Sequence, residues 1–172
     1  KLSQVKTQKL LNDLPMYLKG IGRTLESMPG KKAIFVILDS DDADCAELKK
    51  DLVEMYEKLG VTVDVYFCIA IEEMEAWLLG DEKAIEEAYP QAKMPLLRKY
   101  VQDSIVGTWE YLADVVYSGG VNALKKKAES YYEIGLFKCE CAGNIGMYLN
   151  IHENKSPSFN YFINKLNDFC EV

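Results

Sequence analysis

The sequence predicts an α/β fold with a small, mostly parallel sheet covered by helices and a helical C-terminal half. Two runs of strand length, 33–38 and 61–69, are rich in apolar, β-branched and aromatic residues, as is typical of strands buried on both faces. Between them, residues 45–59 place apolar side chains at three- and four-residue spacings, which indicates an amphipathic helix. Strand, helix and strand in this order form a βαβ unit with parallel strands and a right-handed crossover.

The composition is that of a folded globular protein. The chain has 172 residues, 49% of them hydrophobic, and a net charge of −7, which suits one structural domain and argues against a broad surface that coats nucleic acid. Five cysteines and a single histidine do not form the closed four-ligand pattern of a structural zinc site. No run reaches membrane length and no signal peptide is visible, so we expect a cytoplasmic protein without a membrane partner.

The N-terminal segment is predicted to be helical. Residues 6–21 carry an approximate helical stripe of apolar side chains, which Pro15 should kink or divide. Gly20 and Gly22 should end the helix, and 23–32 should be a loop. The chain begins at Lys1 without a methionine, and α/β sheets commonly open with a strand, so we expect a first strand to be missing before Lys1.

Helix boundaries in the first half are marked by capping residues. Asp44 is a suitable N-cap for the helix at 45–59, and Gly60 stands where a helix ends in a left-handed residue. Asp81 can cap a short helix that runs through Ala88 and is ended by Pro90. We therefore place an α/β core in residues 1–90.

Residues 91–172 are expected to form a helical extension packed on that core. Helical patterns occur near 109–116, in a polar stretch around 125–127, and in a glycine-interrupted segment near 136–149. The last helix is the clearest, because Ser156 is a good N-cap and Pro157 suits the first helical position.

Acidic side chains follow both predicted strands. Asp39 and Asp41 come directly after the first strand, and Glu72, Glu73 and Glu75 follow the second. The carboxyl ends of parallel strands meet at one edge of the sheet, where open α/β sheets place their ligands. Clustered carboxylates repel one another unless a cation is present, so Asp39 and Asp41 are predicted ligands of Mg²⁺ or Mn²⁺. Glu73 and Glu75 are candidate catalytic residues, as a general base or as ligands of a second ion.

The charged residues are also compatible with purely structural roles. Acidic residues are favoured at the start of any helix because of the helix dipole, so the acids could be structural. Lys93, Arg98 and Lys99 are weak candidates for binding substrate phosphate, because a solvated helix face is the more common explanation for any one of them.

Two further motifs suggest a family resemblance. The segment 71–81 reads Ile-Glu-Glu-Met-Glu-Ala-Trp-Leu-Leu-Gly-Asp, and 154–159 reads Asn-Lys-Ser-Pro-Ser-Phe. Together with the acidic strand end at Asp39 and Asp41, this order resembles a Toprim-related family of domains of unknown function, over about residues 30–170. The resemblance implies a Toprim-like three-layer α/β/α fold.

Toprim domains use a glutamate after their first strand and an Asp-x-Asp pair after a later strand to hold magnesium for phosphodiester chemistry. The resemblance makes Asp39 and Asp41 that pair. The glutamate has no counterpart here, since its strand would precede Lys1, and its role could have passed to Glu73 or Glu75.

Three functions follow from these residues. The first is a Mg²⁺-dependent phosphodiester enzyme, a nuclease whose partner is nucleic acid. The second is a phosphatase with Asp39 as nucleophile, although no second strand ends in Ser or Thr and no late pair of acids is present. The third is a non-catalytic module on a Toprim-like scaffold, which binds protein, an upstream domain or nucleic acid, for example in a defence or mobile-element system.

Overall fold

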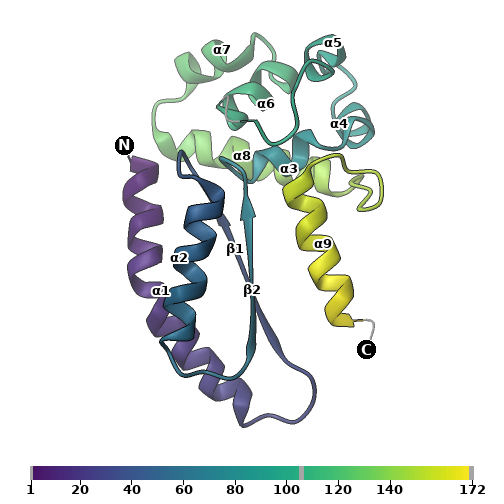
Figure 1. The fold of residues 1–172 in the computed structure, drawn as a ribbon. Helices are drawn as coiled ribbons and strands as arrows, with labels where there is room; N and C mark the ends of the chain where they lie inside the picture. Colours follow the sequence, from purple (N-terminus) through teal and green to yellow (C-terminus); the bar gives the residue numbers. More distant parts are fainter. Residues whose placement is uncertain (1, 105–106, 171–172) are drawn as a thin grey trace.

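A two-stranded parallel sheet lies at the centre of the first half of the protein. The computed structural model describes residues 2–104 and 107–170, with only the backbone of residues 2–10. Strands β1 (Ala33–Asp39) and β2 (Asp64–Ala70) pair in register from Ala33 opposite Asp64 to Asp39 opposite Ala70 (Figure 1). The predicted α/β class, with its parallel sheet and helical C-terminal half, is confirmed.

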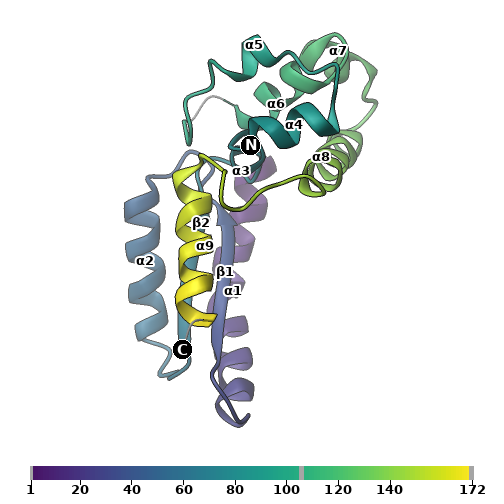
Figure 2. The ribbon, with the colours of Figure 1, turned by 90° about the vertical axis from the view of Figure 1, so that its right-hand side faces the viewer.

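Helices cover both faces of this sheet. Helices α1 (Leu2–Glu26) and α2 (Cys45–Glu57) pack on one face, and α9 (Pro157–Cys170) packs on the other (Figures 1 and 2). Side chains alternate along each strand, so one face contributes to a core with α1 and α2, while Phe35 on the other face contacts rings of α9. The first core contains Leu14, Leu18, Leu38, Leu52, Phe67 and Ile69.

Helix α1 differs from its prediction. It continues through Pro15, Gly20 and Gly22 to Glu26, so the predicted break and the loop beginning at residue 23 were wrong. Proline removes one backbone hydrogen bond from a helix, but Leu14 and Leu18, on either side of it, are 6% and 1% exposed. Burial of these two side chains against the sheet outweighs the local cost of the proline.

The capping predictions are confirmed. Asp44 accepts hydrogen bonds from the amides of Ala46 and Glu47 at the start of α2, and Gly60 has a φ of 63° just beyond its end. At the start of α4 (Glu82–Ala88), Asp81 accepts a hydrogen bond from Ala84 N at 3.0 Å. These short-range signals fix helix ends because they satisfy backbone donors that the helix leaves unpaired.

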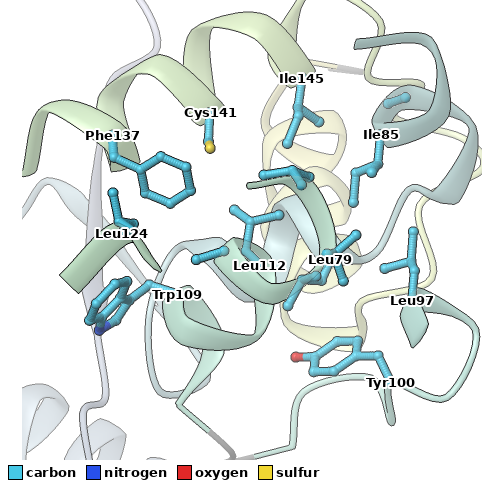
Figure 3. Packing of buried hydrophobic residues seen from close by; sticks show 14 of the residues in the cluster. Leu79, Ile85, Leu97, Tyr100, Trp109, Leu112, Leu124, Phe137, Cys141 and Ile145 are labelled. Carbon is cyan, nitrogen blue, oxygen red and sulfur yellow. The ribbon is translucent and has the colours of Figure 1, made fainter. Parts of the chain in front are cut away.

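The helical half has a separate core. It is enclosed by α3 (Glu75–Leu79), α4, α5 (Met94–Leu97), α6 (Thr108–Val116), α7 (Gly120–Lys127) and α8 (Tyr131–Gly146) (Figure 1). Its buried side chains include Leu79, Ile85, Leu97, Leu112, Phe137 and Ile145 (Figure 3). Packing therefore groups α3 and α4 with the later helices, while α9 returns to the sheet. The domain boundary near residue 90 stays a prediction.

The start of α9 is joined to the end of α3. Asn154 donates a hydrogen bond to Trp77 O at 2.7 Å, and Gly80 O accepts one from Lys155 N at 2.9 Å. The Trp77 ring stacks on Phe162 at a centroid distance of 5.5 Å, and its Nε1 donates to Ser158 Oγ. This joint fixes the helical half against the layer formed by α9.

In the part of the chain that the structure describes, no helix combines the length and apolar character needed to cross a membrane.

We predict that Gly80→Ala weakens this joint. An added Cβ would lie 2.1 Å from Asn154 Oδ1 and 3.0 Å from Ser156 N, so the free energy of unfolding should fall by about 1–3 kcal/mol in a denaturant titration. Gly20→Ala is the matched control, because a Cβ there meets nothing within 4 Å. In a double-mutant cycle, Asn154→Ala should relieve part of the cost; strict additivity would contradict the proposed clash.

Candidate acidic site at the sheet edge

Backbone hydrogen bonds continue the pairing of the two strands into their acidic turns. Ser40 N donates to Ala70 O, and Asp41 N donates to Glu72 O, both at 2.9 Å. Glu72 N in turn donates to Ser40 Oγ at 2.7 Å. Asp41 and Glu72 have left-handed φ values of 48° and 60°, which turn the chain sharply at the strand ends. The two acidic segments are therefore held side by side, as predicted from the parallel strands.

Two of the predicted acidic residues pair with one lysine, and a third lies near enough to feel its charge. Lys138 of α8 places its Nζ 3.2 Å from Glu73 Oε1 and 3.1 Å from Glu75 Oε2. Glu75 is only 5% exposed. The Asp39 carboxylate is close enough for its ionisation to be affected by both Glu75 and Lys138. We call Asp39, Glu73, Glu75 and Lys138 the acidic site.

The charges of the acidic site are not balanced among the described residues. Glu73 and Glu75 share the single ammonium group of Lys138, and the buried Asp39 Oδ1 has no hydrogen-bond partner in the described part of the chain. A buried carboxylate oxygen without a partner is costly. The arrangement thus leaves a carboxylate oxygen that could ligate a metal ion, together with excess negative charge, at the carboxyl end of β1.

Burial and mutual repulsion change the ionisation of the site. Burial, reinforced by the charge of Glu75 and opposed by Lys138, raises the pKa of Asp39 to about 6. Burial also raises the pKa of Glu73, again against the opposing charge of Lys138. For Lys138, burial favours the neutral amine, but Glu75 and Glu73 outweigh it, so the pKa of the lysine is raised. The lysine therefore stays charged while Asp39 changes its protonation close to neutral pH.

Glu72 and Asp41 have different surroundings from these three acids. The Glu72 carboxylate accepts hydrogen bonds from Gly107 N and Thr108 N, each at 2.8 Å, at the start of α6. Favourable interaction with a helix amino terminus explains this position. Asp41 is half-buried in the turn beside Asp39. Its negative charge contributes a little to the raised pKa of Asp39. Asp41 thus borders the acidic site, whereas Glu72 fastens α6 to the sheet edge.

The predicted phosphate-binding residues lie apart from this site. Lys93, Arg98 and Lys99 are exposed at the two ends of α5, which lies in the part of the helical half away from the strands (Figures 1 and 2). Arg98 Nε is 3.6 Å from Glu82. The structure does not bring these residues together with the acids, so their role in binding phosphate stays a prediction.

Lys138 was missed by the sequence reasoning. It is the only basic residue in α8, and it lies on the helix face that buries Ile134, Phe137 and Cys141. A lone lysine within an apolar helical stripe is a signal for a buried ion pair. Its partners lie 63 and 65 positions away in sequence, so the sequence alone did not identify them.

A closed metal site is not visible in this arrangement. Among the described residues, no group of three or more His, Cys, Asp and Glu side chains is arranged to hold a metal ion. Any cation in the acidic site would thus have few protein ligands.

The fold and this cluster define an α/β protein with an acidic site at the carboxyl edge of a parallel sheet. Residues 2–167 match the family described as Domain of unknown function (DUF4276), and the chain belongs to this family. Neither the curated proteins nor the solved structures gave a match to the chain.

We predict that Asp39→Asn stabilises the protein above pH 6. An acid with a raised pKa in the folded state opposes folding once it ionises, so the native chain should lose stability as the pH rises from about 4 through 6. From the pKa of about 6, the variant should be about 2 kcal/mol more stable at pH 8 and nearly equal at pH 4. Denaturant titrations at both pH values test this; a gain that is the same at both would contradict it.

Lys138→Met should destabilise the fold. The variant keeps the length of the side chain but leaves Glu73 and Glu75 without a cation, at a cost of about 3 kcal/mol at pH 7. Acidification to pH 5 should recover part of the loss, because the carboxyls then bind protons. Lys126→Met, at an exposed position on α7, is the control and should change stability little.

Proposed function

We propose that the acidic site binds a divalent cation, Mg²⁺ or Mn²⁺, and that the protein is a phosphodiester enzyme that cleaves nucleic acid. The observation that carries this proposal is that Glu73 and Glu75 share Lys138 as their ion-pair partner at the carboxyl edge of the sheet, while the negative charge of Glu75 also acts on the nearby Asp39. A buried excess of carboxylates is stabilised by a cation.

The residues present suit magnesium better than a metal ion whose coordination sphere is filled by protein ligands. Mg²⁺ is commonly bound by one or two carboxylates, with water and substrate phosphate completing its octahedron. Asp39 has a buried oxygen without a hydrogen-bond partner among the described residues, and the buried Glu75 is close enough to raise its pKa. These two residues would hold the ion. When bound, such an ion offsets the negative charge of a substrate phosphate and lowers the pKa of an attacking water.

The other residues of the site have roles of their own in this proposal. Burial raises the pKa of Glu73, which makes this carboxylate a stronger general base. Lys138 holds Glu73 and Glu75 in place through its two ion pairs. Asp41, beside Asp39, would be a further ligand of the ion.

The resemblance to Toprim-related domains supports the same chemistry. It assigns Asp39 and Asp41 to the Asp-x-Asp pair that holds magnesium in Toprim enzymes. Both follow a strand of a parallel sheet covered by helices on both faces, which is compatible with a Toprim-like fold.

Cation binding is tested by calorimetry and by electron paramagnetic resonance with Mn²⁺. We expect binding that strengthens from pH 5 to pH 7 as Asp39 ionises, and that weakens at least about 10-fold in Asp39→Asn and in Glu75→Gln. Asp51→Asn removes the same charge from an exposed position on α2 and should bind as the native chain does.

Cleavage is tested with supercoiled plasmid, single-stranded DNA and RNA in Mg²⁺ or Mn²⁺. Asp39→Asn should lower the cleavage rate about 100-fold or more, and Asp51→Asn should not lower it. Absence of cleavage with all substrates, or equal rates in Asp39→Asn and the native chain, would refute the enzymatic proposal.

A non-catalytic binding module is the second candidate. The observation that favours it is that Lys138 already neutralises part of the acidic site, so the lysine could be a structural counterion. Absence of Mn²⁺ binding to the native chain, with its fold intact, would favour this alternative.

A further inference from the structure

Helix α8 has two apolar faces, and among the described residues only one of them is buried by packing within the chain. Phe137, Cys141 and Ile145 point into the core of the helical half (Figure 3). The opposite face carries Tyr132, Leu136, Cys139, Gly143 and Gly146, all exposed, at alternating spacings of four and three residues. That spacing is typical of the residues along which one helix packs against another. We call these five residues the outer stripe.

Large apolar side chains gather around the outer stripe. Tyr132 is 72% exposed and Leu136 is 51% exposed, while Met147 at the end of α8 is 77% exposed. Of the fifteen exposed large apolar residues in the described part of the chain, six lie between residues 131 and 151. A concentration of this kind marks a surface that another molecule covers.

The glycines of the outer stripe are not explained by packing within the chain. A Cβ added at Gly143 or Gly146 would meet nothing within 4 Å. Glycine inside a helix lowers stability by about 1 kcal/mol relative to alanine. Gly143 therefore destabilises α8, and no close contact with the described residues explains why a glycine stands there. Close approach of another backbone is a common reason for such a glycine.

The stripe is complementary to itself. If two copies of α8 pack antiparallel about a two-fold axis close to Cys139, Leu136 of one copy lies near Gly143 of the other, and Tyr132 lies near Gly146. Bulky side chains then meet glycines on both sides of the axis, as an interface formed by one surface with itself requires. Glu140 lies beside the seam, where it lines a hollow shared with Lys127 of α7.

The available area is sufficient for a weak dimer. Tyr132, Leu136 and Met147 together expose on the order of 400 Å² per chain, and the smallest stable interfaces take about 600 Å² from each partner. The exposed Cys139, Gly143 and Gly146 of the stripe, with Glu140 and Ala142 beside them, supply the remainder. We propose that the chain forms a two-fold homodimer through antiparallel packing of the outer stripe of α8.

The dimer is tested by light scattering and sedimentation over a range of concentrations. The native chain should dimerise with a Kd of about 1–100 µM. Gly143→Leu, which places a second bulky side chain opposite Leu136, should weaken dimerisation at least about 10-fold. Gly20→Leu, at an exposed helix glycine on α1 where a Cβ meets nothing, should leave it unchanged.

An exchange of sizes tests the register itself. The double variant Leu136→Gly with Gly143→Leu restores one large and one small residue at each facing pair, so it should dimerise better than Gly143→Leu alone. Circular dichroism and thermal melting establish that each variant is folded. A native chain that stays monomeric at 200 µM, about twice the upper end of the expected Kd range, or a double variant no better than Gly143→Leu, would overturn the proposal.

A thiol crosslink locates the axis. Cys139 and Cys170 are the exposed cysteines of the described residues, so the experiment uses a Cys170→Ser background. A short bismaleimide should then join two chains through Cys139, and Gly143→Leu should reduce the yield. A dimer that resists this crosslink would place the interface elsewhere and overturn the assigned register.

Discussion

The buried ion cluster formed by Glu73, Glu75 and Lys138 determines how the two halves of the protein meet. Glu73 lies in the turn that follows β2 and Glu75 begins α3, while the lysine comes from α8 in the helical half. Removing three charges from water is costly unless each has a close partner, so α8 has little freedom to shift along the sheet edge. Glu72 acts in the same direction by binding the amides of Gly107 and Thr108. Two separately packed cores are thereby fixed to one another by polar contacts.

Local signals predicted most of the fold, and long-range contacts account for what was missed. Asp44 and Asp81 cap their helices as the sequence indicates, because a cap depends on three or four adjacent residues. Pro15 was misinterpreted because its helix is stabilised by burial against a sheet that local sequence does not show. The acidic site was predicted in part, since the edge of a parallel sheet brings Asp39 and Glu75 together. Lys138 required a contact across more than sixty residues.

The motifs that carried the family resemblance prove to be one structural unit. Trp77 and Gly80 contact Asn154 and Ser158, while Asp103 accepts hydrogen bonds from Ser156 Oγ and Ser158 N. These contacts explain why the segments near 77–81 and 154–159 contain such particular residues. They concern the joint between α3 and α9 rather than chemistry. The chemical question therefore rests on the adjoining acids, above all on Asp39 and Glu75.

The position of Lys138 also has a thermodynamic consequence for cation binding. Its side chain belongs to α8, which is anchored in the helical core by the buried Phe137 and Cys141, so the ammonium group cannot diffuse away as a solvated counterion would. If a cation binds at the acidic site as proposed, it must displace this tethered charge or share the carboxylates with it, and its affinity then reflects the free energy of an exchange. A monovalent ion gains little by replacing an ammonium group of equal charge, whereas a divalent ion adds one unit of charge. The tethered lysine would thus make the site bind divalent cations in preference to potassium and sodium.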